Sequence, residues 1–294
     1  MIITDKNSVV KKNNRVIDRK ERTMAYDVIV IGGGPAGLSA AVNVRARGRS
    51  VLVVSNPMEE NPLWKAERID NYLGLPGLTG SELLKRFRSH AEQSGAEFRE
   101  GRVLNALYSE PDWYVSIGSD VESAKAIVLS GGVARAKKFP GEAEFLGRGV
   151  SYCATCDGML YRNRPVVVAG YSESAKKEAE FLRSIGCDVT YFDRPRRCEI
   201  LGSSKAERVI CDGQEVETSC VFLLRPSLAP TDVFPKMAVE NGYVKVDRSM
   251  ATNLIGVFAA GDCTGGPLQV SRAVGEGLVA GQSAAKFVAA LARE

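Results

Sequence analysis

Apolar runs followed by a turn and an amphipathic stretch occur twice along the chain. Residues 26–55 read YDVIVIGGGPAGLSAAVNVRARGRSVLVVS, which predicts a buried strand, a glycine turn, a helix with small residues on one face and a second strand. Residues 166–182 read VVVAGYSESAKKEAEFL and predict a buried strand, a tight turn and the start of a helix. This order of elements is the local architecture of a dinucleotide-binding site, so the pattern predicts an α/β protein with Rossmann-like units.

Two further stretches complete the predicted elements. Residues 241–288 predict a hairpin strand, an apolar strand that ends at Gly261 and Asp262, and then a helix. Residues 207–227 predict a hairpin about Asp212 and Gly213, followed by one more strand. These elements follow the second dinucleotide-type unit closely and leave little room there for a complete nucleotide-binding fold.

The first turn has the glycine spacing that a bound pyrophosphate requires. Gly32, Gly34 and Gly37 make the pattern G-x-G-x-x-G directly after the strand. Gly32 permits the tight turn, Gly34 lets a pyrophosphate approach the backbone, and Gly37 packs the helix on the sheet. Pro35 and Ala36 open the helix, whose positive N-terminus would hold the phosphates.

Composition excludes several classes of function. The chain has 294 residues, 45% of them hydrophobic, which is enough for two domains. No apolar run approaches the roughly 18 residues of a membrane span, and there is no apolar leader, so we predict a cytoplasmic protein with no membrane partner. The single histidine, His90, argues against a metalloenzyme or a serine-type triad, and no metal is predicted.

The net charge of +4 comes from the N-terminus. Residues 1–23 hold seven Lys and Arg against three Asp and Glu, and the remainder of the chain balances 32 against 32. The stretch KKNNRVIDRKER could contact nucleic acid or a membrane. We interpret residues 1–23 as a basic, disordered extension or as the product of a start codon upstream of Met24, and we predict no nucleic-acid partner.

Two of the seven cysteines have redox spacing. Cys153 and Cys156 form C-x-x-C, which in a cytosolic protein indicates a redox disulfide or half of a zinc site. Structural zinc needs four ligands, whereas the other five cysteines are isolated in the sequence and the chain has one histidine. A buried inert pair is the other alternative. Asp157 favours thiol chemistry, because an acid beside a thiol can donate and accept a proton.

The stretch FLGRGVSYCATCDG, with a nucleotide-type strand shortly after it, resembles the low-molecular-weight thioredoxin reductases. The resemblance runs from about Met24 to the C-terminus. It implies two nested Rossmann-like domains: an FAD-binding domain of residues 24–133 and 227–294, split by an inserted domain of residues 134–226 that carries the redox disulfide. It also implies a homodimer and a rotation of the inserted domain about the two crossings.

The same resemblance gives roles to the redox residues. Cys156 matches the thiol that faces the flavin, and Cys153 matches the thiol that attacks the disulfide of thioredoxin. Asp157 matches the acid that protonates or deprotonates the attacking thiol.

Cofactor contacts also follow from the resemblance. It implies FAD against the glycine turn and against a second signature at Gly261 and Asp262, where Asp262 would bind the ribityl hydroxyls. The loop RIDNYLG offers Asn71 as a contact, and the start of the last helix offers Gln269 and Val270.

The second turn departs from the pattern of the family members that bind NADPH. Those members carry G-x-G-x-x-A and, beyond the next strand, a basic cluster for the 2′-phosphate. Here Gly170 is followed by Tyr171, and Ser172 brings a side chain to the place where the backbone should approach pyrophosphate. Glu173 places a carboxylate where the phosphates would lie, and Asp193 replaces the start of the basic cluster. We therefore predict that NADPH does not bind.

In these respects the chain is similar to the ferredoxin-dependent flavin thioredoxin reductases. That subgroup keeps FAD and CATCD, carries a Gly-Tyr turn and takes electrons from reduced ferredoxin. The similarity implies ferredoxin as the electron donor and thioredoxin as the acceptor. Lys137, Lys138 and the run Arg194–Arg197 are candidates for steering an acidic ferredoxin.

Three alternatives stay open. Asp193 ends the second strand 23 residues after Gly170, near the position from which an acid binds the ribose of NADH, so the enzyme could be NADH-linked. A diflavin enzyme would place another FAD in the former nicotinamide pocket. A non-catalytic flavoprotein sensor is the third, and the intact Cys153, Cys156 and Asp157 argue against it.

Overall fold

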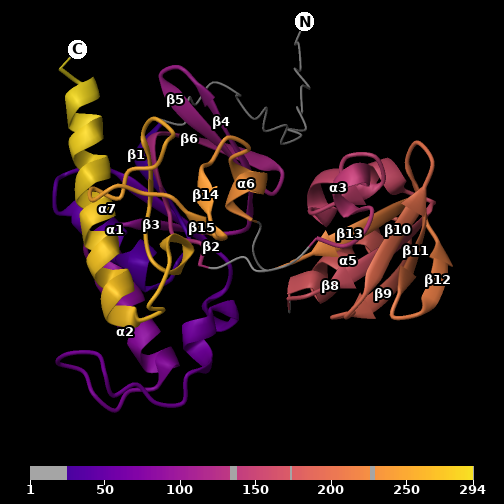
Figure 1. Ribbon diagram of the computed structural model, residues 1–294, viewed down its shortest axis with the longest axis horizontal. Helices are drawn as coiled ribbons and strands as arrows, with labels where there is room; N and C mark the ends of the chain where they lie inside the picture. Colours follow the sequence, from indigo (N-terminus) through magenta and orange to yellow (C-terminus); the bar gives the residue numbers. More distant parts are fainter. Residues whose placement is uncertain (1–24, 133–137, 173, 226–228, 294) are drawn as a thin grey trace, which may run out of the picture.

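The computed structural model describes residues 25–132, 138–172, 174–225 and 229–293 (Figure 1). One body contains residues 25–132 and 229–293, and we call it the split domain. The other contains the middle of the chain, residues 138–225, and we call it the inserted domain. The basic tail and the residues at the predicted domain limits, 133–134 and 226–227, lie outside the described residues, so the domain limits stay predictions.

A seven-stranded sheet forms the centre of the split domain. The strands β3, β2, β1, β6 and β16 run parallel, and β6 continues into an antiparallel ladder with β5 and β4. Their bounds are β1 Tyr26–Ile31, β2 Val51–Ser55, β3 Glu97–Glu100, β4 Val103–Ser109, β5 Asp112–Ile117, β6 Asp120–Leu129 and β16 Val257–Ala259. The middle residues of β1 are fully buried, as expected for a parallel strand covered on both faces.

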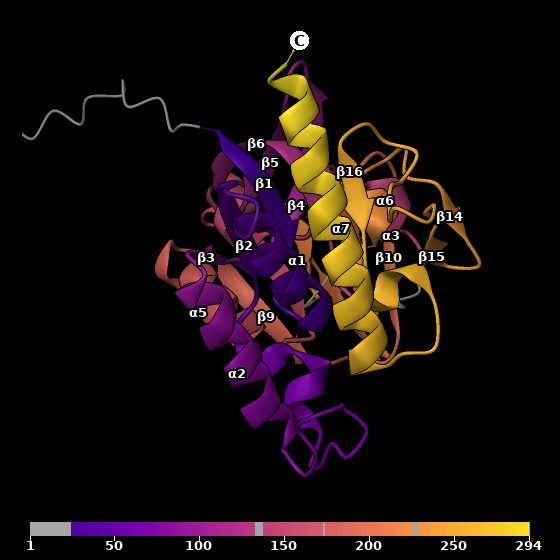
Figure 2. The same cartoon turned by 90° about the vertical axis from the view of Figure 1, so that its left-hand side faces the viewer.

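Helices α1 (Pro35–Arg45) and α7 (Val270–Leu291) lie side by side against one face of this sheet (Figure 2). Small residues permit the close approach: a Cβ atom on Gly277 would lie 2.1 Å from the carbonyl oxygen of Ala36. Helix α2 (Gly80–Gln93) packs beside α1 and begins with a capping box of Thr79 and Glu82. The shorter elements are η1 Met58–Glu60, η2 Pro62–Lys65, α6 Pro230–Val233, β14 Val239–Glu240, β15 Tyr243–Val244 and η4 Asp262–Thr264.

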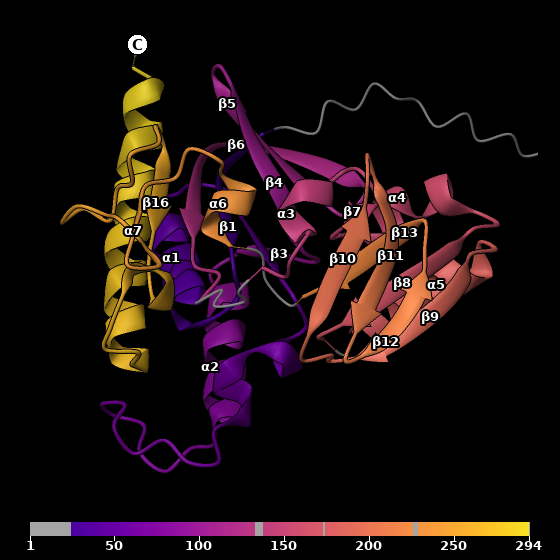
Figure 3. The ribbon, with the colours of Figure 1, turned by 45° about the vertical axis from the view of Figure 1, so that its right-hand side comes forward.

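The inserted domain contains a parallel sheet, in the order β7-β13-β8-β9, and an antiparallel sheet, in the order β10-β11-β12 (Figure 3). Helix α5 (Ser174–Ser184) connects β8 to β9, which gives one strand–helix–strand unit of the dinucleotide-binding type. The other bounds are α3 Glu142–Phe145, β7 Val150–Ser151, α4 Ala154–Asp157, η3 Gly158–Tyr161, β8 Pro165–Gly170, β9 Asp188–Asp193, β10 Cys198–Gly202, β11 Ala206–Cys211, β12 Gln214–Glu217 and β13 Cys220–Leu224.

The α/β fold class with two Rossmann-like domains is confirmed. The hairpin predicted about Asp212 and Gly213 joins β11 to β12, and both residues have the positive φ, 48° and 90°, that a type I′ turn requires. Within the described ranges, no helix is long and apolar enough to cross a membrane.

A buried ion pair ties the beginning of the inserted domain to its end. Arg225 follows β13, and its guanidinium donates to both carboxylate oxygens of Glu142 in α3, at 2.6 and 2.8 Å. The hydroxyl of Tyr152 donates to the same carboxylate at 2.9 Å. Burial pushes the pKa of Glu142 up, but the hydrogen bonds from Arg225, Phe139 and Tyr152 hold it below its ordinary value.

Replacing Arg225 is expected to destabilise the protein strongly. Arg225→Met leaves Glu142 buried without its partner, which costs about 3–5 kcal/mol. Because the native pKa of Glu142 is lowered, the pair stabilises the protein fully above the ordinary glutamate pKa, and this stabilisation is lost as the pH falls through the native pKa. Urea unfolding of the wild-type protein and of Arg225→Met should therefore show the largest difference in free energy of unfolding at neutral pH. An equally large difference under strongly acidic conditions would contradict the assignment.

Candidate active site

A cavity of about 690 Å³ opens at the carboxyl ends of the parallel strands β1, β2 and β6. This is the edge of an open α/β sheet at which ligands bind, and the volume suits a cofactor. The cavity is bounded by the first glycine turn, by the segment after β2 and by the loop after β16. Eight of the predicted cofactor residues line it: Gly32, Gly34, Pro35, Ala36, Gly261, Asp262, Gln269 and Val270.

The glycine turn fits tightly against the end of β6. Gly32 has a φ of +114°, and a Cβ atom there would lie 2.4 Å from the carbonyl oxygen of Ser130. A Cβ atom on Gly37 would lie 1.9 Å from the carbonyl oxygen of Gly32, so Gly37 serves packing and lies outside the cavity lining. A Cβ atom on Gly34 would meet only the side-chain nitrogen of Asn61, at 3.3 Å. The turn therefore leaves its open space at Gly34, facing the cavity.

Two helices begin at the cavity without side-chain caps. Helix α1 has Gly34 as its N-cap, and helix α7 has Gln269, and neither residue accepts a hydrogen bond from its helix through its side chain. Neither helix has an acidic residue in its first turn. The unpaired amide groups and the positive helix ends suit negatively charged phosphates. The residues present therefore fit a dinucleotide such as FAD, although each residue's role in binding stays a prediction.

The loop after β16 is held in shape by Glu276 of α7. One carboxylate oxygen of Glu276 accepts from the amide of Gly261 and from the hydroxyl of Thr264, both at 2.8 Å, and Arg272 pairs with the other oxygen at 2.6 Å. Burial raises the pKa of Asp262, Arg272 opposes that effect, and Glu276 adds to it. Asp262 is thus a partly dehydrated carboxyl group in the cavity lining, which suits hydrogen bonds to hydroxyl groups.

Asn71 lies outside the cavity lining but contacts it indirectly. Its side-chain amide donates to Gln269 at 2.8 Å, which joins two predicted cofactor residues that are 198 positions apart. Sequence reasoning missed the polar lining residues Asn61, Arg102 and Ser130. No local motif marks these three residues, because each reaches the cavity from a different segment of the chain.

The redox pair lies in the inserted domain at the start of α4. Cys153 and Cys156 form a disulfide with their Cα atoms 5.4 Å apart. The amide of Cys156 donates to the sulfur of Cys153 at 3.2 Å. An amide directed at a sulfur at a helix N-terminus stabilises the thiolate. Cys153 is buried and Cys156 is half-buried.

Ser151 connects the disulfide to Asp157. Its hydroxyl donates to the carboxylate of Asp157 at 2.7 Å, and the same oxygen accepts the amide of Cys153 at 3.1 Å. The hydroxyl of Ser151 therefore bridges the carboxylate of Asp157 and the backbone amide of Cys153. At this distance from the redox pair, Asp157 could supply or remove a proton. Sequence reasoning missed Ser151, and its only signal was its position two residues before Cys153.

The side chains of the second turn make contacts within the inserted domain. The ring of Tyr171 stacks on Phe139 with centroids 6.2 Å apart, and its hydroxyl donates to the carbonyl oxygen of Pro195 at 3.0 Å. Ser172 is buried, and its hydroxyl lies 2.8 Å from that of Ser174. Glu173 lies outside the described residues. Another carboxylate takes the first amide of α5: Ser174 donates its N–H to Glu60 of the split domain at 3.2 Å.

The inserted domain contains a second cysteine pair, which the sequence did not predict. Cys198 and Cys211 face each other across β10 and β11, with Cα atoms 4.3 Å apart, and form a second disulfide. The pairing was invisible in the sequence because a hairpin ladder, and not short spacing, brings the two residues together. Cys187, Cys220 and Cys263 are buried free thiols. No group of metal-binding side chains occurs in the part of the chain that the structure describes.

Comparison with known proteins places this site in a family. The family described as pyridine nucleotide-disulphide oxidoreductase matches residues 26–210 and 198–277. A thioredoxin reductase of Listeria innocua is 31% identical and covers 90% of this chain and 94% of that protein. The chain belongs to the low-molecular-weight thioredoxin reductase family.

Other members of the thioredoxin reductase family agree over both domains. The thioredoxin reductase of Aquifex aeolicus is 35% identical over 81% of this chain and 85% of that protein. A crystal structure of a ferredoxin-flavin thioredoxin reductase from Clostridium acetobutylicum superposes with a TM-score of 0.86 at 32% identity, and covers 92% of this chain and 99% of that chain. As a family member, the chain is a flavoprotein disulfide oxidoreductase.

Proposed function

We propose that this protein reduces thioredoxin with electrons that reduced ferredoxin supplies through FAD, without a pyridine nucleotide. The observation that carries the proposal is the contact between Glu60 and the first amide of α5. In a working dinucleotide site this helix end would hold phosphate. In this orientation of the domains, a carboxylate of the split domain occupies that position and would repel phosphate.

Other groups around the second turn support the proposal. The space beside Gly170 at the end of β8 is taken by other side chains, because a Cβ atom on Gly170 would lie 2.4 Å from the hydroxyl of Tyr191 and 2.8 Å from the Cβ atom of Ala175. At the end of β9, Asp193 stands where a 2′-phosphate would need positive charge. The superposition on the ferredoxin-flavin enzyme of Clostridium acetobutylicum, which spans both domains, also favours this donor.

FAD would be held by the turn at Gly32 and Gly34, by the N-termini of α1 and α7, and by Asp262. The cofactor supplies the capacity to collect electrons singly and to pass them on in pairs. Two electrons and two protons convert the disulfide of Cys153 and Cys156 into two thiols.

The thiolate of Cys153 then attacks one sulfur of thioredoxin's disulfide and forms a mixed disulfide, while the other thioredoxin sulfur leaves as a thiolate and takes a proton. Cys156 attacks Cys153 in the mixed disulfide, which re-forms the internal bond and releases the second thioredoxin thiolate. Asp157, hydrogen-bonded to Ser151, would serve as the acid and base for these proton transfers.

Ferredoxin would dock through exposed basic groups. Arg196 and Arg197 are exposed, and their backbone amides bind the carboxylate of Asp212, which fixes the loop that carries these two charges. Lys138 is less suitable, because it pairs with Asp232 at 2.7 Å. Lys137 lies outside the described residues. A homodimer and a cytoplasmic location complete the proposal by analogy with the family.

An NADH-linked reductase is the second candidate. The intact unit of β8, α5 and β9 favours it, since Asp193 ends β9 near the ribose position of such units. The occupied amide of Ser174 opposes it.

Anaerobic stopped-flow reduction of the bound flavin distinguishes the donors. We expect reduced ferredoxin to bleach the flavin at least about a hundredfold faster than NADPH or NADH. The site lacks two favourable phosphate contacts, one at the first amide of α5, which Glu60 occupies, and one at the end of β9, where Asp193 stands. The ferredoxin rate should fall as salt rises, since exposed charges are screened over about 8 Å at physiological ionic strength. Charge reversal at Arg196 and Arg197 should remove most of the salt dependence. Fast bleaching by NADH with matching thioredoxin turnover would favour the second candidate.

A further inference from the structure

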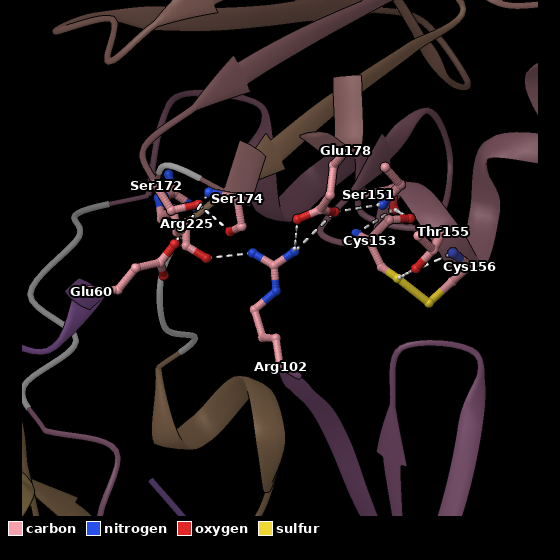
Figure 4. A network of polar contacts seen from close by, with 11 residues as sticks. Glu60, Arg102, Ser151, Cys153, Thr155, Cys156, Ser172, Ser174, Glu178 and Arg225 are labelled. Carbon is pink, nitrogen blue, oxygen red and sulfur yellow. Dashed lines mark hydrogen bonds and ion pairs between the residues drawn. A yellow bond between two sulfur atoms is a disulfide. The ribbon is translucent and has the colours of Figure 1, made fainter. Parts of the chain in front are cut away.

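Arg102 of the split domain reaches across to the inserted domain. It stands between β3 and β4, and it lines the cavity that suits the cofactor. Its guanidinium donates to the backbone carbonyl of Arg225 and to both carboxylate oxygens of Glu178 in α5, the latter at 3.3 and 3.4 Å (Figure 4). One side chain thus connects the wall of the cavity with two elements of the other domain.

The contact continues from Glu178 to the redox pair. One carboxylate oxygen of Glu178 accepts the amide of Ala154 at 3.3 Å. Ala154 follows Cys153 and is the first residue of α4. Two consecutive hydrogen-bonded contacts therefore separate the cavity wall from the turn that holds the disulfide, as Figure 4 shows.

The ion pair between the domains is largely removed from water. The side chains of Arg102 and Glu178 are only 13% and 19% exposed. Burial lowers the pKa of Arg102 and raises that of Glu178, and each charge opposes the shift of the other. Removing one partner would leave the other charge buried and unpaired in a medium of low dielectric. The pair therefore favours the orientation of the domains in which both partners meet.

A second contact acts beside the first. Glu60 lines the same cavity, and its carboxylate accepts the amide of Ser174, the first residue of α5, which lies about one helical turn before Glu178. The second oxygen of Glu60 is buried and has no hydrogen-bond partner among the described residues. Arg102 lies close enough to Glu60 for their charges to interact. The two acidic side chains, one from each domain, thus flank one arginine.

We propose that Arg102 is a positioning residue that clamps the inserted domain onto the split domain through Glu178 and Glu60. With the clamp closed, the disulfide is tied to the cavity wall and Cys153 is buried; with the clamp open, Cys153 becomes accessible to a protein disulfide. The inference rests on the proposed function only in taking Cys153 as the attacking thiol. Opening and closing the clamp changes no covalent bond.

Alkylation of the reduced full-length protein tests the clamp without flavin reduction or an electron donor. Iodoacetamide is added after phosphine reduction, and mass spectrometry follows the rate at Cys153 and Cys156 separately. We expect Arg102→Met and Glu178→Gln each to raise the rate at Cys153 about tenfold, and the double variant to add little more. The alkylation rate at Cys153 in Arg102→Lys should lie between those of the wild type and of Arg102→Met. A lysine lacks the forked donors with which the arginine reaches both Arg225 and Glu178.

Arg99→Met is the matched control. Arg99 pairs with Asp120 and Glu122 inside the split domain, so its loss breaks an ion pair of similar kind without touching the contact between domains. It should leave the alkylation rate at the wild-type value. An unchanged rate in both Arg102→Met and Glu178→Gln, or an equal rise in Arg99→Met, would overturn the proposal. The donor experiment can fail while these results stand, since alkylation requires neither ferredoxin nor FAD.

Discussion

Cys153→Ser and Cys156→Ser are each expected to lower thioredoxin turnover by at least about three orders of magnitude, because a single thiol cannot complete both halves of the exchange. The two variants should differ in their spectra. Cys153→Ser leaves Cys156, the thiol predicted to face the flavin, and should develop a long-wavelength charge-transfer band in the orientation that brings thiolate and flavin together. Cys156→Ser should lack that band. Steady-state assays with thioredoxin and absorption spectra of the reduced proteins give both measurements.

The second disulfide offers a matched control. The double change of Cys198→Ala and Cys211→Ala removes a bond between β10 and β11 and touches no residue of the redox turn. We expect it to lower stability and to leave turnover within about twofold of wild type. A loss of turnover in this double variant as large as that in Cys153→Ser and Cys156→Ser would mean that the second disulfide carries electrons. Full turnover in both redox variants would make the bond of Cys153 and Cys156 structural.

Gly34→Leu is expected to weaken retention of the cofactor strongly while the protein still folds. The backbone there has room for a side chain, since a Cβ atom would meet only the end of Asn61, at 3.3 Å. A leucine would fill the space that a pyrophosphate needs, and crowding of that kind costs about 1–3 kcal/mol, or roughly tenfold to a hundredfold in affinity. The wild-type protein should be yellow with one FAD per chain, and the variant should lose most of its flavin on gel filtration.

Gly275→Ala controls for the loss of a glycine. Gly275 is exposed in α7, and a Cβ atom there would meet nothing within 4 Å. We expect it to keep its flavin and to gain slightly in helix stability. A wild-type protein that stays colourless after incubation with FAD would refute the assignment of the cavity.

The proposed clamp bears on how a donor that delivers single electrons could be used. A disulfide accepts two electrons, so with such a donor the enzyme would have to hold the first until the second arrives. Cys153 is buried in this orientation of the domains, and the proposed clamp would protect it there from premature exchange. Release of the clamp after reduction would then expose it to thioredoxin.

The sequence alone determined the parts that depend on local spacing. The pattern at Gly32, Gly34 and Gly37 predicts the turn because only residues without a Cβ atom avoid the contacts seen at Gly32 and Gly37. The C-x-x-C spacing places two sulfurs within bonding reach on the first turn of a helix, whatever the remainder of the fold. The type I′ hairpin at Asp212 and Gly213 follows from the same kind of local rule.

The tertiary structure decided which distant residues meet. Glu60 and Arg102 carry no motif, and they reach α5 only because the inserted domain lies against the cavity of the split domain. Cys198 and Cys211 pair because the ladder of β10 and β11 places them opposite each other. Contacts of this kind depend on the register of strands and on the packing of domains, which are set by buried surface summed over many residues and not by the spacing of a few.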